Sequence, residues 1–188
     1  MTKRQFLAGK LLIAMPSIQG DDFERSVVFL CAHSEDGAMG LVINKPAPRM
    51  VFADLAEKLQ LDHTAEEILQ LPVMFGGPVK QFQGFVLHST DYKSDETMQV
   101  NENFALTATV DILKAIAKSK GPVAKLLALG YAGWSPGQLE SEIMRNGWLH
   151  CDADPELVFA HPRAHLHEAA LGKLGVSAAM LSSEAGRA

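Results

Sequence analysis

The chain has 188 residues, of which 47% are hydrophobic and 21% are charged, and its formal net charge is −5. A chain of this length is expected to fold as one domain and to bury roughly 70% of its unfolded surface, so its core requires neither disulfides nor a metal. The composition excludes collagen-like, disulfide-rich and intrinsically disordered proteins. The acidic balance disfavours direct DNA binding, because affinity for phosphates normally comes from a basic surface.

The cysteine content and the apolar runs bear on the cellular compartment. The two cysteines are Cys31 and Cys151, and Cys31 lies in an apolar run, where a thiol behaves as a small hydrophobic group. Two reduced, buried cysteines are typical of a cytoplasmic protein. No apolar run approaches the roughly 20 residues of a membrane span. We therefore expect a cytoplasmic protein that does not insert into a membrane.

Three β-strands are predicted in the first part of the chain, over residues 11–18, 26–33 and 38–44. The second is an almost continuous apolar run, which is typical of a strand covered on both faces. Turn residues at 34–37 join it to the third strand as a hairpin. Gly40 in the third strand indicates a bulge or a close approach of another backbone. Pro46 and Pro48 are expected to end this segment.

The rest of the chain mixes helices with short strands. Helices are predicted over residues 52–59, 110–117, 136–145 and 162–171, with short helices starting at a Thr64 capping box and at Asp154-Pro155. Strands are predicted over residues 71–75, 84–88, 98–100, 123–129 and 148–151, with a glycine-rich loop after residue 129. Hairpins in the first part of the chain, followed by a mixture of helices and strands, predict one α+β domain over residues 1–188 rather than a doubly wound fold. Residues 183–188 are predicted to be a frayed tail.

A possible hydrolase motif lies between a predicted strand and a predicted helix. Residues 133–137 (GWSPG) match G-x-S-x-G. In such a motif the residue after the serine donates its backbone N–H to the oxyanion, and Pro136 has no N–H. The same residues make a good helix start, with Ser135 as N-cap, Pro136 as first helical residue and Gln138 completing a capping box. We favour this structural interpretation and predict no catalytic residue.

Histidines near the C-terminus raise the question of a metal site. His161 and His165 are four residues apart, but Pro162 places His161 at the edge of the predicted helix. His165 and His167 point to different helix faces. No C-x-x-C or H-E-x-x-H motif, dinucleotide fingerprint or P-loop accompanies them. We predict no metal and no cofactor.

Several sequence blocks occur in a fixed order along the chain. They are residues 25–28 (RSVV), 37–46 (GAMGLVINKP), 76–79 (GGPV), 84–89 (GFVLHS), 130–134 (GYAGW) and 137–140 (GQLE), followed by Trp148. By these blocks the chain resembles the YqgE/AlgH family of bacterial proteins over essentially its full length. The resemblance implies a compact α+β fold with a mixed, strongly bent sheet, in a cytoplasmic protein. It implies little chemistry, because the family is uncharacterised in biochemical terms.

Some members of this family carry the label of transcriptional regulator, through a link to alginate production. This sequence contains no helix-turn-helix with a basic recognition helix. We therefore interpret the label as indirect. Our first functional hypothesis is a non-enzymatic regulatory or binding protein that acts through another protein or a small ligand.

The second hypothesis is a small-molecule site, with or without enzymatic activity, at the ends of predicted strands. Its candidate residues are Arg25, Asn44, Lys45 and His88. Two cations, an amide and an imidazole suit a small anionic ligand. The alternative is structural: Arg25 pairs with a carboxylate such as Glu140, and Asn44 satisfies backbone groups of a turn. On the sequence alone we favour these structural roles.

Overall fold

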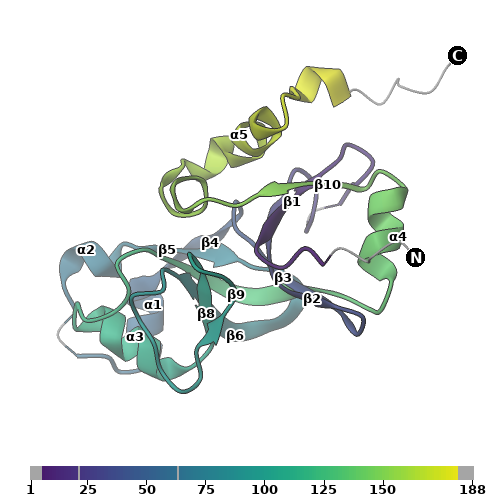
Figure 1. Ribbon diagram of the computed structural model, residues 1–188. Helices are drawn as coiled ribbons and strands as arrows, with labels where there is room; N and C mark the ends of the chain where they lie inside the picture. Colours follow the sequence, from purple (N-terminus) through teal and green to yellow (C-terminus); the bar gives the residue numbers. More distant parts are fainter. Residues whose placement is uncertain (1–5, 21, 63, 182–188) are drawn as a thin grey trace, which may run out of the picture.

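The computed structural model describes residues 6–20, 22–62 and 64–181, and the frayed tail predicted over residues 183–188 lies outside them. In this part of the chain, helices pack around a strongly curled sheet of ten strands (Figure 1). The strands are β1 (Lys10–Ala14), β2 (Val27–Ser34), β3 (Gly37–Val42), β4 (Pro46–Val51), β5 (Pro72–Phe75), β6 (Val79–His88), β7 (Met98–Gln99), β8 (Ala105–Thr107), β9 (Lys125–Trp134) and β10 (Trp148–Asp152). The helices are α1 (Phe52–Lys58), α2 (Glu66–Leu69), α3 (Val110–Ala117), α4 (Gln138–Met144) and α5 (Leu166–Lys173), with a π-helical turn at Glu156–Ala160 and 3-10 turns at Arg163–His165 and Ala178–Leu181. The predicted α+β class is confirmed.

The strand order is β10-β1-β2-β3-β9-β6-β8-β7, with antiparallel neighbours throughout. β5 joins the side of this path, where it pairs in parallel with β9 and antiparallel with β4. The β5–β9 pair makes the sheet mixed, as the family resemblance implied. β9 is the central strand, because it pairs with β3, β5 and β6.

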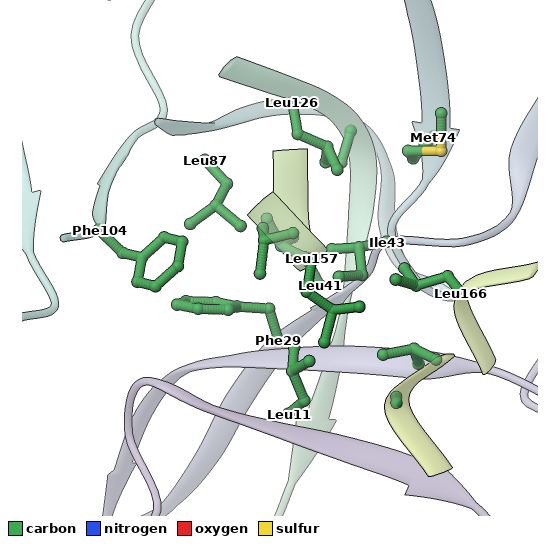
Figure 2. Packing of buried hydrophobic residues seen from close by; sticks show 14 of the residues in the cluster. Leu11, Phe29, Leu41, Ile43, Met74, Leu87, Phe104, Leu126, Leu157 and Leu166 are labelled. Atoms are coloured by element: carbon green, nitrogen blue, oxygen red, sulfur yellow. The ribbon is translucent and has the colours of Figure 1, made fainter. Parts of the chain in front are cut away.

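The curl of the sheet is evident from one aromatic contact in its core. Phe29 lies on β2 and Phe104 directly precedes β8, and three strands separate β2 from β8 in the sheet order. In a flat sheet, strands four positions apart would lie roughly 19 Å from each other. The two ring centroids are nevertheless 4.8 Å apart (Figure 2). The sheet therefore bends until its two halves face each other across a shared core.

Both faces of the sheet are buried against helices. Leu11 of β1 and Phe29 of β2 face the core cluster that includes residues of α5. Their neighbours Leu12 and Val28 face a second cluster, which includes α4 and both tryptophans of the chain. A third cluster lies between α1, α3 and the strands β5, β6 and β9. The prediction that residues 26–33 form a strand covered on both faces is confirmed.

The hairpin of β2 and β3 contains the close approach that Gly40 predicted. A Cβ on Gly40 would lie 2.6 Å from Val28 Cγ1 and 2.8 Å from the Phe29 carbonyl oxygen. The pairing register shifts on β2 between Leu30 and Ala32, which is a β-bulge opposite this glycine. Gly40 therefore allows the two strands to pack at a point where no side chain fits.

The first strand ends four residues earlier than predicted, at Ala14. Pro16 has no N–H to donate to a neighbouring strand, which ends regular pairing. Met15 N–H donates instead to Gly147 O at 2.9 Å, and Ile18 N–H donates to Met15 O at 2.9 Å. Residues 15–18 thus form an irregular segment that leaves the sheet, and this segment borders the candidate site described below.

Pro46 and Pro48 do not end the strand segment as predicted, because they lie inside β4. β4 pairs with β5 at its two ends, Pro46 with Met74 and Val51 with Pro72. A strand at the edge of a sheet tolerates proline, since the missing N–H is needed by no neighbour. Proline therefore marks a sheet edge here rather than the end of an element.

The glycine-rich stretch predicted as a loop is the second half of β9. Gly130 has a φ of +74°, and a Cβ there would lie 2.3 Å from Gly77 O. A Cβ on Gly77 would in turn lie 2.2 Å from the Tyr131 carbonyl carbon. These glycines let the turn before β6 lie directly against β9, so the strand continues through Gly130 to Trp134.

Two smaller differences concern local signals. The short helix predicted from Thr64 forms as α2, but Ala65 precedes its first residue and no side chain caps it, so the predicted capping box is wrong. β8 was not predicted, because three residues are too few for a periodic signal.

The helix start predicted at Asp154 is confirmed, since its Oδ1 accepts a hydrogen bond from Leu157 N–H at 2.8 Å. None of the helices in the described ranges is long and apolar enough to cross a membrane.

Candidate functional site

Two of the four predicted site residues, Arg25 and Asn44, are in direct contact. Asn44 Nδ2–H donates to Arg25 O at 2.9 Å, and Asn44 Oδ1 accepts from Val27 N–H at 2.8 Å. The amide therefore ties the end of β3 to the backbone that enters β2. This confirms the structural role considered for Asn44, and it also makes Asn44 a positioning residue for Arg25.

Arg25 lies in a strained turn and its side chain points to the surface. Its φ is +54°, in the left-handed region, and its side chain is 61% exposed. The guanidinium pairs loosely with Glu168 of α5, with Nη2 and Oε1 3.7 Å apart. Glu140, the partner considered from the sequence, pairs instead with His33, whose Nε2 lies 3.2 Å from Oε1. The expected pairing of Arg25 with a carboxylate is therefore confirmed, but the partner is Glu168 and not Glu140.

Lys45 and His88 do not line the pocket that Arg25 borders. Lys45 O accepts a backbone hydrogen bond from Phe75 N–H at 2.7 Å. His88, at the end of β6, is completely buried: Nδ1–H donates to Ser89 O, and Nε2 accepts from the Thr107 hydroxyl, both at 2.8 Å. Its imidazole is thus enclosed by the protein's own groups.

The pocket beside Arg25 has a volume of about 190 Å³. It lies where β1 ends, where the chain enters β2, and where α5 and the last 3-10 turn pass over them. Its described lining is Ala14, Met15, Pro16, Ile18, Glu24, Arg25, His167, Ala178 and Leu181. Most of this lining is apolar, with three ionisable side chains. Such a mixture is typical of small-molecule sites, and the volume is below the roughly 300–1,000 Å³ of pockets for drug-sized ligands.

His167 lines this pocket but is not among the ligand-binding residues predicted from the sequence. Its side chain reaches back from α5 to β1, where Nε2–H donates to Ala14 O at 2.9 Å. The residue is only 7% exposed, and its Nδ1 is buried without a hydrogen-bond partner. Burial lowers the pKa of His167 and the nearby Arg25 guanidinium lowers it further, against the opposing effects of the Ala14 hydrogen bond and Glu168. The neutral imidazole therefore presents a lone pair at Nδ1.

A second unsatisfied group belongs to a residue that also bonds to the Ala14 backbone. Ser26 is completely buried and its hydroxyl has no partner, while its carbonyl accepts from Ala14 N–H at 3.0 Å. Across the described residues three buried side-chain polar atoms lack a partner, and two of them belong to Ser26 and His167, which both bond to the Ala14 backbone through other atoms. Because buried polar groups are nearly always paired, such a concentration requires an explanation.

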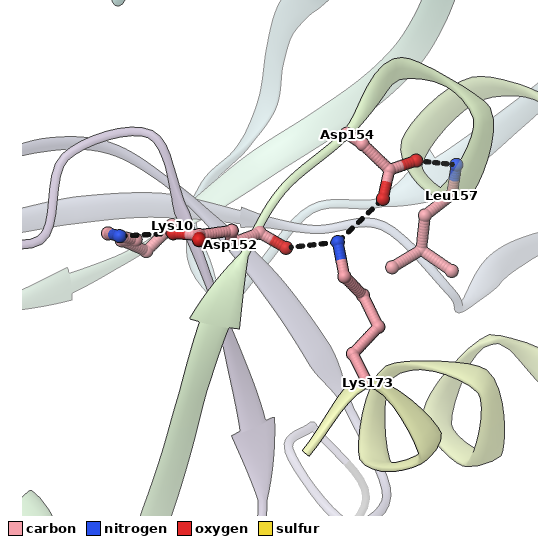
Figure 3. A network of polar contacts seen from close by, with 5 residues as sticks. All are labelled: Lys10, Asp152, Asp154, Leu157 and Lys173. Atoms are coloured by element: carbon pink, nitrogen blue, oxygen red, sulfur yellow. Dashed lines mark hydrogen bonds and ion pairs between the residues drawn. The ribbon is translucent and has the colours of Figure 1, made fainter. Parts of the chain in front are cut away.

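A network of polar contacts fixes the helix that carries His167. Lys173 Nζ donates to Asp152 O at 3.0 Å and to Asp154 Oδ2 at 2.6 Å, and Lys10 pairs with the Asp152 carboxylate (Figure 3). The contacts with Lys10 and Lys173 lower the pKa of Asp152 and Asp154, respectively. α5 is thereby tied to β10, so His167 is held over the end of β1.

A larger concavity of about 410 Å³ lies on the other side of residues 15–18 and contains both tryptophans. Glu142 Oε2 accepts from Trp134 Nε1–H at 2.9 Å and from Trp148 Nε1–H at 2.8 Å, and Gln138 donates to Oε1. Phe23 packs edge-on against Trp148. Glu142 is thus already satisfied by three donors, which makes this surface a structural joint between α4 and the sheet.

The G-x-S-x-G segment is part of the same joint. Gln138 Oε1 accepts from Ser135 N–H at 3.0 Å, which is one of the two contacts of the predicted capping box. α4 starts at Gln138 with Gly137 as its N-cap, so the prediction of Ser135 as N-cap and Pro136 as first helical residue is wrong. No group of three or more His, Cys, Asp or Glu side chains in the described ranges is placed to hold a metal ion. Cys31 and Cys151 are free and buried, and burial raises the pKa of both thiols.

Two of the three buried histidines in the described chain, His88 and His167, make the fold sensitive to acid. Burial is the main cause that lowers the pKa of both His88 and His167. Below about pH 6.5, the ordinary imidazole value, the unfolded chain therefore binds more protons than the folded one, so the free energy of unfolding decreases. We expect full stability above this pH and a loss of at most about 1.4 kcal/mol per pH unit for each histidine below it.

This acid sensitivity is measured by urea unfolding between about pH 7.5 and pH 5, above the range in which carboxylates titrate. His167→Gln is expected to reduce the dependence on pH, whereas His165→Gln, at an exposed position two residues away, leaves it unchanged. Equal stability of the wild-type protein at both ends of this range would contradict the assignment of neutral histidines.

The fold and the pocket define a single α+β domain on a curled sheet with a small, partly charged concavity beside its C-terminal helix. The sequence profile of the family described as AlgH-like (DUF179) matches residues 11–179, so the chain belongs to this family, as its sequence blocks indicated. A UPF0301 protein of Afipia carboxidovorans is 51% identical over 192 residues, covering 97% of this chain and 90% of the relative. A UPF0301 protein of Nitrobacter hamburgensis is 50% identical, covering 98% and 89%.

Two solved structures share the fold. The solution structure of the AlgH protein from Pseudomonas aeruginosa is similar with a TM-score of 0.80 and 39% identity, covering 100% of this chain and 99% of that one. A crystal structure of a protein from Corynebacterium diphtheriae has a TM-score of 0.74 at 20% identity, covering 97% and 95%. The second likeness concerns the fold alone.

Proposed function

We propose that the chain is a non-enzymatic binding protein whose ligand is a small organic anion, held in the pocket of Arg25 and His167. One observation carries this proposal: the largely exposed guanidinium of Arg25 and the side chain of His167, whose buried Nδ1 has no partner, line the same small pocket. A guanidinium is the side chain best suited to bind a carboxylate or a phosphate. The apolar remainder of the lining suits a hydrocarbon body.

An anion is favoured by Arg25 itself, the only cation of the described lining, which also contains Glu24. Arg25 has a loose contact with Glu168, 3.7 Å apart, on a surface where such pairs contribute little energy. The guanidinium can therefore exchange this partner for a ligand at small cost. Asn44 and the strained turn hold the Arg25 backbone in place, so the site is largely formed before the ligand binds.

The absence of a reactive pair supports binding without catalysis. The pocket's described lining contains no serine, threonine, cysteine or lysine that His167 could activate. Elsewhere in the described chain, His33 Nδ1 accepts a hydrogen bond from Leu7 N–H at 3.0 Å, and His88 is enclosed by Ser89 and Thr107. On this proposal any effect on transcription is indirect and is exerted by the liganded protein, in keeping with the net charge of −5.

The test is a titration with straight-chain carboxylates of four to six carbons and with their neutral amides, followed by calorimetry. We expect the carboxylates to bind and the amides to bind at least about ten-fold more weakly, since a charged hydrogen bond contributes roughly 1.5–3 kcal/mol. Arg25→Gln is expected to abolish this discrimination. Arg49→Gln is the matched control, because Arg49 is also an exposed arginine with a left-handed φ of +55° but lies outside the pocket.

Two results would overturn the proposal. One is that carboxylates and amides bind the wild-type protein equally, or that neither binds at concentrations of tens of millimolar. The other is that Arg25→Gln and Arg49→Gln weaken binding to the same extent, because the anion would then respond only to the overall charge of the protein.

A further inference from the structure

We infer that the ligand of this pocket carries a hydrogen-bond donor in addition to its anionic group, and that His167 Nδ1 accepts from this donor. The class is a small hydroxy acid, or an anion with an N–H at the equivalent position. The inference rests on the proposed function, because it concerns the chemistry of the same pocket.

The first step is the position of the imidazole proton. His167 Nε2 lies 2.9 Å from Ala14 O, and a carbonyl oxygen can only accept, so Nε2 carries the proton. In a neutral imidazole the other nitrogen is then an acceptor. A carboxylate or an ether oxygen offers nothing to this atom, whereas a hydroxyl or an N–H does.

The second step is that the protein leaves this acceptor unused. Only 7% of His167 is exposed, and the residue lines the pocket. No described group donates a hydrogen bond to its Nδ1. The charged groups around it are Arg25 and Glu24 on the segment before β2 and Glu168 on α5. The nearby cation, Arg25, opposes protonation of the imidazole. A donor on the ligand is therefore the natural partner at neutral pH.

The third step is the shape of the space around the two polar groups. Met15 and Ile18 from the irregular segment after β1, and Leu181 from the last 3-10 turn, form apolar walls. The cavity of about 190 Å³ leaves room for a short chain and no large ring system. These walls favour a hydroxylated short-chain acid over a highly polar sugar phosphate.

The experiment compares acids that differ by a single hydroxyl: butyrate with 2- and 3-hydroxybutyrate, and hexanoate with 2- and 3-hydroxyhexanoate. We expect at least one hydroxy acid to bind the wild-type protein about ten-fold more tightly than its parent acid. This comparison uses the unmodified protein and does not depend on the folding of any variant.

Two variants locate the effect at His167. His167→Gln can keep an N–H near Ala14 O but removes the acceptor at the Nδ1 position, and it is expected to reduce the preference for the hydroxyl to less than two-fold. His167→Asn places an amide oxygen near the Nδ1 position and is expected to keep part of that preference. In both variants the preference for carboxylate over amide, which depends on Arg25, should remain.

The outcomes separate this inference from the proposed function. If the hydroxy acids and their parents bind equally while carboxylates still bind better than amides, the inference is wrong and the anion site stands. If His167→Gln keeps the full preference for the hydroxyl, the acceptor is another group and the inference is again wrong. If no acid binds in an Arg25-dependent manner, the proposed function itself fails.

Discussion

Phe29→Ala is expected to lower the free energy of unfolding by about 3–5 kcal/mol, as is typical when a buried aromatic ring is removed from a core. Phe29 is completely buried on β2 and its ring packs against Phe104, 4.8 Å away between centroids (Figure 2). Its contact joins the two halves of the curled sheet, so the cavity left by alanine lies where little can move to fill it. The loss should therefore be near the upper end of this range.

The measurement is urea unfolding at neutral pH, with Phe82→Ala as the matched control. Phe82 lies on β6 and is 99% exposed, so its removal should change the stability by less than about 0.5 kcal/mol. If the two alanine variants had the same stability, the packing of β2 against β8 would not hold the sheet together.

Gly77→Ala is expected to cost about 3 kcal/mol or more, although it adds a single methyl group. Gly77 has a φ of +152°, and a Cβ there would lie within 2.4 Å of three backbone atoms of Tyr131 and Ala132. The backbone conformation and the clash each cost roughly 1–3 kcal/mol, and a backbone neighbour cannot rotate away as a side chain would.

The control for Gly77 is a glycine in open space. Gly172 lies in α5, and nothing lies within 4 Å of a Cβ built there. Gly172→Ala should be neutral or stabilise the protein by up to about 1 kcal/mol, because alanine favours the helix. Thermal unfolding of both variants compares them directly. A Gly77→Ala protein as stable as Gly172→Ala would show that the turn before β6 can move away from β9.

Elements with a strong local pattern could be predicted from the sequence. The apolar run of β2, the turn that follows it and the close approach at Gly40 each depend on a few adjacent residues. The full length of β9 could not be predicted from adjacent residues in this way. Its glycines indicate a loop when considered alone, and only the opposing Gly77, more than fifty residues away, explains why a strand continues through Gly130.

The candidate site could be predicted only in part, because its residues also come from distant parts of the sequence. Arg25 and Asn44 were selected because they lie at predicted strand ends, and the structure brings them into contact. His167 was considered only as a metal ligand, because its partner Ala14 is 153 residues away in the sequence. Nothing near His167 in the chain indicates that α5 places one ring nitrogen on β1 and leaves the other buried without a partner.

The most direct test of the ligand pocket is an NMR titration of ¹⁵N-labelled protein with each of the four hydroxy acids compared above, observing backbone amides, both tryptophan indoles and the histidine rings. We expect the largest shifts at Arg25, His167 and the end of β1, with His167 Nδ1 shifting as it accepts a hydrogen bond. The indoles of Trp134 and Trp148, held by Glu142 in the neighbouring concavity, should shift little. Shifts centred on those indoles, or no saturable shifts at all, would contradict the assignment of this pocket as the ligand site.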